Sequence, residues 1–234
     1  SLHILLKKLC EIKGIRWIRV LYCYPEEIYD ELIETIRDEK KICHYLDIPI
    51  QHASDRILKR MGRRTSKQEL IDIVGKLRKE IPDIVLRTTL ITGFPGETEE
   101  DHEELKEFVD EMEFDRLGVF TYSPEENTPA AEMADQVPEE VKEERRDELM
   151  ELQQEISYDK GQDRIGQELL VMIEGKVADE SAYIGRTYGD APKVDGYIFV
   201  QTGELLMTGD FAKVRVTGAL EYDLIGVLSD EYTE

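Results

Sequence analysis

The chain has 234 residues, enough for one large domain or two ordinary ones, and its hydrophobic fraction of 41% is sufficient for a packed core. Its 52 acidic against 30 basic residues give a formal net charge of −22, which excludes a broad nucleic-acid-coating role, because the average field repels phosphates. No apolar run has the length of a membrane span, and the first residues lack the pattern of a signal peptide. Three cysteines do not make a disulfide framework, so we expect a reducing, cytoplasmic compartment.

The first half of the chain alternates short apolar runs with amphipathic stretches. Strands are predicted at residues 17–24, 42–50, 83–93 and 115–123, and helices at residues 2–14, 25–39, 54–62, 65–81 and 98–112. Ser66, three residues before Glu69, predicts a capping box, and Thr98 is a predicted N-cap. The strand–helix alternation predicts an α/β fold with a parallel sheet or barrel and right-handed crossovers.

The character of the sequence changes near residue 160. Residues 124–137 predict a loop and residues 138–162 a long charged helix. Short β-rich runs follow at residues 168–175, 197–203, 211–220 and 222–228, separated by Gly, Asp and Pro turns, which predicts a small antiparallel barrel. We therefore expect a first domain over residues 1–137, a connecting helix over 138–160 and a barrel domain over 161–234.

Polar side chains share one face of the predicted parallel strands. Side chains alternate along a strand, so Asp47 and Gln51 face one way on the second strand, and Arg87 and Thr89 on the third. Arg19 has the same parity on the first strand. A barrel lumen that holds a ligand would accept these residues, and the two arginines suit an anionic group such as a carboxylate. The alternative is an internal Arg–Asp network that only joins the strands.

The segment 87–105 combines a strand, a glycine-rich turn and a capped helix. Gly93 and Gly96 would let the backbone come close to a ligand, and Phe94 offers an aromatic face on which a base could stack. A tight βα turn without a ligand is the alternative.

Two further positions lie at strand ends. His52 has the parity of the helix-packed face, which favours a hydrogen-bonded core histidine over a base or ligand. Tyr122 has the parity of the lumen and begins a loop that is either substrate-facing or a linker. Cys10, Cys23 and Cys43 lack the short spacing of metal and cluster sites, so no metal site is predicted.

Several segments occur in the order found in the methylthiotransferase family of radical SAM enzymes, which the chain resembles over nearly its whole length. They are RVLYCYP, YLDIPIQHAS, RTTLITGFPGETEED, FTYSPEENTPAA and VRVTGALEYDLIGVL. Within the family, YSPEENTPA, GRTYGDAPKVDG and EYDLIG resemble the branch that modifies ribosomal protein S12 more than the tRNA-modifying branch.

The resemblance implies a partial radical SAM barrel of the TIM type followed by a TRAM domain, a small OB-like β-barrel. The implied reaction converts a C–H bond of an aspartate in S12 to C–SCH3, with S-adenosylmethionine and two 4Fe–4S clusters as cofactors. The cluster-binding C-x-x-x-C-x-x-C run of the family is absent from this sequence and would lie before residue 1. We therefore expect a C-terminal fragment that is inactive alone.

Strand parity combined with the family's geometry assigns cofactor-binding roles. Arg87 would pair with the carboxylate of S-adenosylmethionine, and Gln51 or Ser54 would bond its ribose. Thr89 and Phe94 would line the adenine pocket.

Three other residues are assigned to the lumen and the substrate, and no catalytic residue or metal ligand is assigned. Asp47 and Arg19 would brace the lumen, and Tyr122 would face the substrate.

The charge of the barrel segment bears on the partner. Residues 161–234 contain six Lys or Arg and fourteen Asp or Glu, a net charge of −8. Because phosphate contacts come chiefly from Lys and Arg, this disfavours tRNA and suits a basic ribosomal protein. A reductant protein is a further expected partner. The alternatives are a tRNA methylthiotransferase and a non-catalytic fragment that binds S12.

Overall fold

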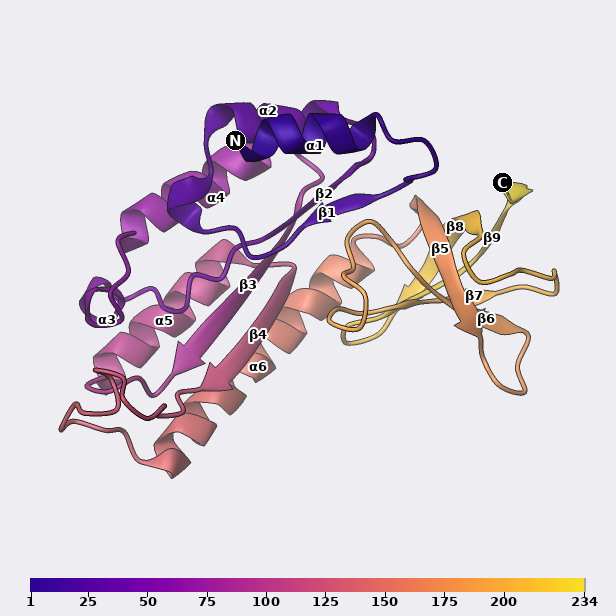
Figure 1. Cartoon of the computed structure of the whole chain (residues 1–234). Coiled ribbons are helices and arrows are strands. Elements are labelled where there is room, and N and C mark those ends of the chain that lie inside the picture. The colour runs from indigo at the N-terminus through magenta and orange to yellow at the C-terminus, as the bar shows by residue number, and fades with distance from the viewer. Residues whose placement is uncertain (234) are drawn as a thin grey trace. The chain divides into compact units, whose positions relative to one another are not determined.

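The computed structural model describes residues 1–233 and the side chains of residues 1–229 (Figure 1). Glu234, the last residue of the expected barrel domain, lies outside the described residues. The chain divides into two compact units, Ser1–Gln153 and Gln154–Glu234. The division falls inside the long helix α6 (Glu139–Gln162), so this helix belongs partly to each unit.

The first unit contains a four-stranded parallel sheet in the order β1-β2-β3-β4. The strands are β1 (Ile18–Val20), β2 (Ile42–Asp47), β3 (Val85–Thr92) and β4 (Arg116–Thr121). The helices are α1 (Leu2–Cys10), the 3-10 helix η1 (Pro25–Glu27), α2 (Asp30–Asp38), α3 (Asp55–Arg60), α4 (Lys67–Glu80) and α5 (Glu99–Met112). Each of β1, β2 and β3 is followed by helix and then by its neighbour in the sheet, which confirms the expected βα succession of a partial barrel.

One face of this sheet carries the core of the unit. Burial alternates along β3, where Leu86, Thr88 and Leu90 are buried while Arg87 and Thr89 are only partly buried. The apolar face packs under helices, as Figure 1 shows for α4, α5 and α6 along one side of the sheet. The polar residues therefore lie on the opposite face, as the parity argument predicted.

Both predicted helix starts are confirmed. The Ser66 hydroxyl accepts from the Glu69 amide while the Glu69 carboxylate accepts from the Ser66 amide, and Thr98 forms the same reciprocal pair with Asp101. These caps fix where α4 and α5 begin.

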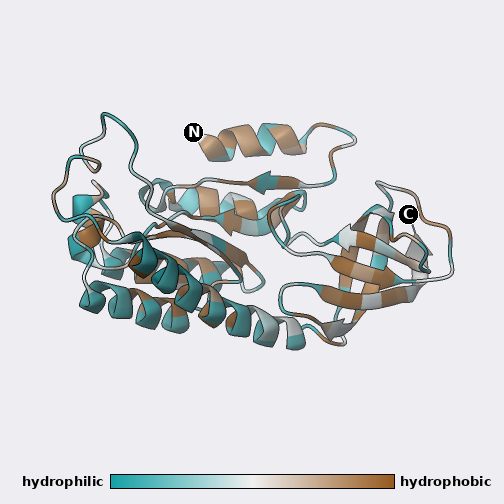
Figure 2. Ribbon diagram, turned by 90° about the horizontal axis from the view of Figure 1, so that it is seen from below, coloured by the Kyte–Doolittle hydropathy of each residue, from teal (hydrophilic) through white to brown (hydrophobic). Residues whose placement is uncertain are grey.

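The second unit is a closed five-stranded barrel in the order β5-β6-β7-β9-β8. Its strands are β5 (Glu168–Lys176), β6 (Ala182–Arg186), β7 (Ile198–Gln201), β8 (Phe211–Ala219) and β9 (Leu224–Thr233). Four of the pairings are antiparallel, and the β7–β9 pair is parallel. Figure 2 shows hydrophobic residues alternating with polar ones along these strands, whereas α6 is hydrophilic over most of its length.

The sequence analysis identified the runs of four of these strands but not β6. This short strand contains Gly185, a residue that disfavours strands, and a Cβ there would collide with Val171 and come within 2.9 Å of the Met172 carbonyl oxygen. Close packing of β5 against β6 therefore requires the glycine that hides the strand in the sequence.

No helix among residues 1–233 is both long enough and apolar enough to cross a membrane.

Candidate functional site

A buried ion pair joins the two central strands on the polar face of the sheet. Asp47 and Arg87 are register partners, and Arg87 Nη1 donates to Asp47 Oδ1 at 2.9 Å and to Thr89 Oγ1 at 3.3 Å. Asp47 is only 2% exposed, so its charge requires such a partner. The structure thus brings together three residues of the predicted lumen.

The neighbouring strands extend this face on both sides. The guanidinium of Arg19 lies 5.0 Å from the centre of the Tyr45 ring, a cation–π contact on the β1 side. On the β4 side a Cβ at Gly118 would lie 3.6 Å from Arg87 Nη2, an ordinary contact distance, so β4 passes directly beside the guanidinium. Phe120, two residues further along β4, is 59% exposed.

Gln51 lies just beyond the carboxyl end of β2, in contact with β3. Its amide donates to the Thr89 carbonyl at 2.9 Å, and its carbonyl accepts from the Ile91 amide at 2.8 Å. Its φ of 73° is unusual for a residue with a side chain, and such strain concentrates at functional sites. The backbone of Gln51 therefore lies beside Thr89 of β3, just past the carboxyl end of β2.

The other predicted site residues lie elsewhere. The Ser54 hydroxyl is buried and donates to Asp101 Oδ1 at 2.7 Å. Phe94 and Tyr122 meet edge to face, with ring centres 5.2 Å apart, in an apolar cluster with Ile57. Their roles toward ribose, adenine and substrate remain predictions, because these side chains contact protein groups in this structure.

A buried carboxylate at the glycine-rich turn was missed by the sequence analysis. The Glu97 side chain is fully buried; Oε2 accepts from the Gly93 amide at 2.8 Å, and Oε1 accepts from Arg145 Nη1 at 2.9 Å. His52 Nε2 lies 3.4 Å from Oε2. Burial would raise the pKa of Glu97, but His52, the Gly93 amide and Arg145 outweigh it and hold the pKa below its ordinary value.

His52 is a core histidine, as the parity argument favoured. It is fully buried, and its Nδ1 accepts from the Ser54 amide at 3.0 Å, so Nε2 is the ring nitrogen that faces Glu97.

Protein side chains, rather than open space, surround the two glycines of the turn. A Cβ at Gly93 would collide with the Lys142 side chain, and a Cβ at Gly96 would collide with Asp135 and approach Arg60 to 2.9 Å. Arg60 Nε also donates to the Pro95 carbonyl at 3.0 Å. The close approach that these glycines permit is therefore made by the protein itself.

Asp101 links this turn to the start of α3. It accepts from the Ser54 hydroxyl and forms an ion pair with Arg56, which also donates to the Gly96 carbonyl at 2.7 Å. Although burial alone would raise it, these hydrogen bonds hold the pKa of Asp101 well below its usual range. Arg56 and Arg60 of α3 therefore both hold the turn, through the Gly96 and Pro95 carbonyls.

The described part of the chain contains no group of three or more His, Cys, Asp or Glu side chains that could hold a metal ion. None of the cysteines Cys10, Cys23 and Cys43 takes part in a disulfide.

A cavity of about 310 Å³ adjoins the polar face. It is lined by the segment Val20–Tyr24 with Ser1, Leu2, Glu27 and Tyr29. The Tyr22 amide, on this segment, donates to Asp47 Oδ2 at 3.2 Å. The cavity at the carboxyl end of β1 is thus linked to Asp47 through Tyr22, although neither Asp47 nor Arg87 lines it.

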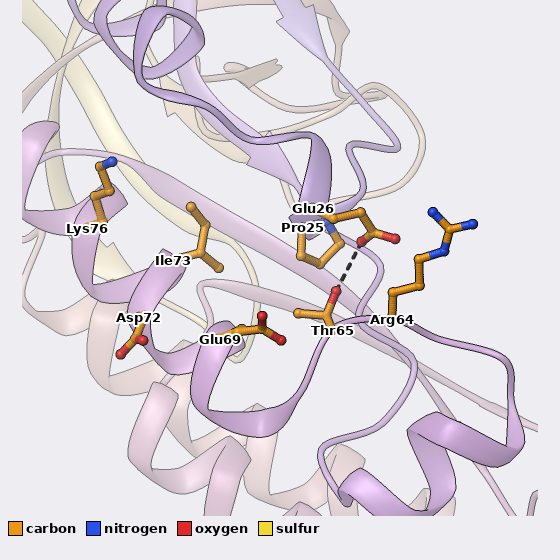
Figure 3. A pocket seen from close by; sticks show the side chains of 8 residues that line it. All are labelled: Pro25, Glu26, Arg64, Thr65, Glu69, Asp72, Ile73 and Lys76. Atoms are coloured by element: carbon orange, nitrogen blue, oxygen red, sulfur yellow. Dashed lines mark hydrogen bonds between the residues drawn. The ribbon is translucent and has the colours of Figure 1, made fainter.

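A larger cavity of about 420 Å³ lies between η1 and α4 (Figure 3). Its lining residues are Pro25, Glu26, Arg64, Thr65, Glu69, Asp72, Ile73 and Lys76. Most of its charged side chains serve local structure; Glu26, for example, accepts from the Thr65 hydroxyl at 3.0 Å. Because it contains none of the residues on the polar sheet face, we place the candidate site at that face and not here.

Comparison with known proteins agrees with this architecture. Residues 2–109 match the model of the radical SAM superfamily, and residues 165–228 match that of the TRAM domain. Coproporphyrinogen III oxidase (HemN) from Escherichia coli, a radical SAM enzyme, has a similar fold with a TM-score of 0.52; the match covers 92% of this chain and 50% of that chain at 16% identity.

Named relatives are similar at the level of sequence. The chain is 66% identical over 222 residues to the ribosomal protein uS12 methylthiotransferase RimO of Lachnoclostridium phytofermentans, which covers 95% of this chain and 50% of that protein. It is 53% identical over 233 residues to the RimO of Clostridium botulinum strain Langeland, covering 100% of this chain and 52% of that protein. The chain thus spans about half the length of these relatives.

This similarity to methylthiotransferases named RimO extends over at least 95% of the chain, and the chain matches both the radical SAM and the TRAM models. The expected fold class, a partial radical SAM barrel followed by a TRAM barrel, is confirmed with it.

Proposed function

We propose that this chain is the cofactor- and substrate-binding part of a methylthiotransferase that modifies ribosomal protein uS12. The observation that carries the proposal is the Arg87–Asp47–Thr89 group on the polar face of a radical SAM sheet, in a chain 66% identical to a protein named for that activity. The proposed target is an aspartate of uS12, and the proposed compartment is the cytoplasm.

The donor set on this face suits the amino-acid end of S-adenosylmethionine. Arg87 supplies a guanidinium for the carboxylate, held in place by Asp47, while Gln51 and Thr89 supply polar groups at the same edge. When bound, the cofactor and a reduced iron–sulfur cluster supply the radical that removes a hydrogen atom from the substrate. Asp47 and Arg19 brace the face so that Arg87 keeps its direction.

Three assigned residues need more than their present contacts to act as proposed. Ser54 would have to share its hydroxyl between Asp101 and the ribose, and Phe94 would have to present the part of its ring that Tyr122 leaves uncovered. Tyr122 has a buried hydroxyl without a hydrogen-bond partner, which is compatible with a polar group arriving from a substrate.

Other statements are proposed on the family resemblance alone. The complete enzyme would use two 4Fe–4S clusters whose ligands lie outside this sequence, a reductant protein would supply electrons, and the chain without those ligands would be inactive. The domain limits 1–137, 138–160 and 161–234 also remain proposals.

The partner is tested by binding of the 234-residue chain to purified uS12 and to tRNA at low and high salt. The net charge of −8 on residues 161–234 predicts salt-sensitive binding to uS12 and none to tRNA. Tight, salt-sensitive tRNA binding would instead assign the chain to the tRNA-modifying branch.

The role of Arg87 is tested in the complete enzyme by equilibrium binding of S-adenosylmethionine. Loss of a charged hydrogen bond in Arg87→Ala is expected to weaken binding by at least about tenfold. Arg87→Lys keeps a charge beside Asp47 and controls for folding, and Arg37→Ala removes an exposed arginine that pairs with Asp38 and Glu80. Unchanged affinity in a folded Arg87→Ala enzyme would refute the carboxylate assignment.

A further inference from the structure

The loop that joins β7 to β8, residues 202–210, presents two large apolar side chains to solvent. Leu205 is 88% exposed and Met207 is 68% exposed, whereas Leu206 between them is 5% exposed and packs in the barrel core. Single exposed apolar residues are common on protein surfaces, but here two of them flank a buried one on the same loop.

This loop is held in one conformation by hydrogen bonds. The Leu206 amide donates to the Tyr183 hydroxyl at 3.2 Å, and the Met207 amide donates to Asp210 Oδ2 at 2.8 Å. The Asp210 carbonyl in turn accepts from the Ile173 amide of β5 at 2.9 Å. A partner that binds the loop therefore loses little affinity to ordering it.

Acidic residues surround the apolar pair. The β5–β6 turn lies at the same end of the barrel, since the Thr202 amide donates to the Ser181 carbonyl at 3.1 Å. The β5–β6 turn, residues 177–181, and the loop 202–210 carry the acids Asp179, Glu180, Glu204 and Asp210 and no Lys or Arg. An apolar contact with an acidic rim fits a basic protein surface and opposes nucleic acid.

We propose that Leu205 and Met207 form the apolar anchor by which this chain docks on its basic protein substrate. This inference rests on the proposed function, which gives a ribosomal protein as the substrate. A ribosomal protein that binds RNA is basic. Met is enriched at interfaces and adapts to its partner, and the acids around it steer the encounter. The anchor supplies the salt-independent part of the affinity, and the rim supplies the salt-dependent part.

The test compares binding of the 234-residue chain and its variants to purified uS12 by isothermal titration calorimetry at several salt concentrations. The double variant L205Q/M207Q is expected to bind at least about tenfold more weakly at every salt concentration, with an unchanged melting temperature. Glu204→Gln is expected to flatten the salt dependence instead.

Val194→Gln is the matched control. Val194 is 57% exposed in the loop between β6 and β7, which lies at the opposite end of the barrel because β7 runs from that loop to the β7–β8 loop. It is expected to bind within about twofold of the wild type. The inference is refuted if L205Q/M207Q binds as the wild type does, or if Val194→Gln loses as much affinity. If the wild type itself does not bind uS12, the proposed function fails first.

Discussion

Replacing Arg145, the buried arginine at the glycine-rich turn, should lower the free energy of unfolding of the first unit. The Arg145 side chain is 7% exposed and pairs with Glu97, whose side chain is fully buried. Arg145→Met keeps most of the volume but leaves the Glu97 carboxylate without its cation. Breaking a buried pair from one side costs about 3–5 kcal/mol. We expect about 3 kcal/mol, because Glu97 keeps the hydrogen bond from the Gly93 amide.

The same helix provides the control. Arg146 pairs with the adjacent Asp147 on the surface, where both side chains are more than a third exposed. Exposed pairs contribute little, so Arg146→Met should change the free energy of unfolding by less than about 0.5 kcal/mol. The second partner of Arg145, Glu99, is 70% exposed, so its loss adds little to the effect of Arg145→Met.

Urea unfolding followed by tryptophan fluorescence isolates the relevant unit. The chain has a single tryptophan, Trp17, which lies in the first unit. With a urea dependence of about 1–3 kcal/mol per M, a loss of about 3 kcal/mol lowers the Arg145→Met midpoint by about 1–3 M. Equal midpoints for Arg145→Met and Arg146→Met would refute the reasoning that the buried pair stabilises this unit.

The pH dependence gives an independent check of the same pair. The pKa of Glu97 is lowered by folding from its ordinary value of 4.5, so its contribution to stability is fully present above about pH 4.5 and is lost as the pH falls through the lower folded-state value. Glu97→Gln cannot titrate. Its unfolding free energy should therefore fall less steeply than that of the wild type below pH 4.5, and parallel curves would contradict the assignment.

Further predictions concern glycines and thiols. Gly75→Ala, in the interior of α4 where a Cβ meets nothing within 4 Å, should stabilise the first unit by about 0.5–1 kcal/mol in urea unfolding. Gly93→Ala should destabilise the first unit by more than about 1 kcal/mol, because the backbone has a φ of 70° there and the new Cβ would collide with Lys142. A neutral effect would mean that the turn can shift. Burial raises the pKa of Cys23 to about 11, so at pH 8 Ellman's reagent should label the partly exposed Cys10 first and Cys23 only on unfolding; early labelling of Cys23 would contradict its burial.

Local rules account for much of what the sequence predicted. The capping boxes at Ser66 and Thr98 depend on residues only three positions apart, so the sequence pattern alone predicts them. Strand parity likewise placed Asp47, Arg87 and Thr89 on one face, because alternation holds as long as a strand continues. It does not extend to Tyr122, which follows the last residue of β4 and packs beside Phe94.

Long-range partners explain what the sequence could not predict. Glu97 and Arg145 are separated by 48 positions, and each lies among other charged residues that are exposed. No periodicity distinguishes the buried member of such a run from its solvated neighbours. A glycine is equally ambiguous, since the same residue is required whether a ligand or a protein side chain approaches its backbone.

The start of α6 resolves that ambiguity for the glycine-rich turn. Lys142 and Arg145 are one helical turn apart, and both side chains are buried. Lys142 covers Gly93 and donates to the Tyr122 carbonyl at 2.9 Å, while Arg145 holds Glu97. One helix face thus fixes the loop ends of β3 and β4 together. Because the Lys142 side chain lies against Gly93, the side of this turn that faces α6 is closed to a ligand.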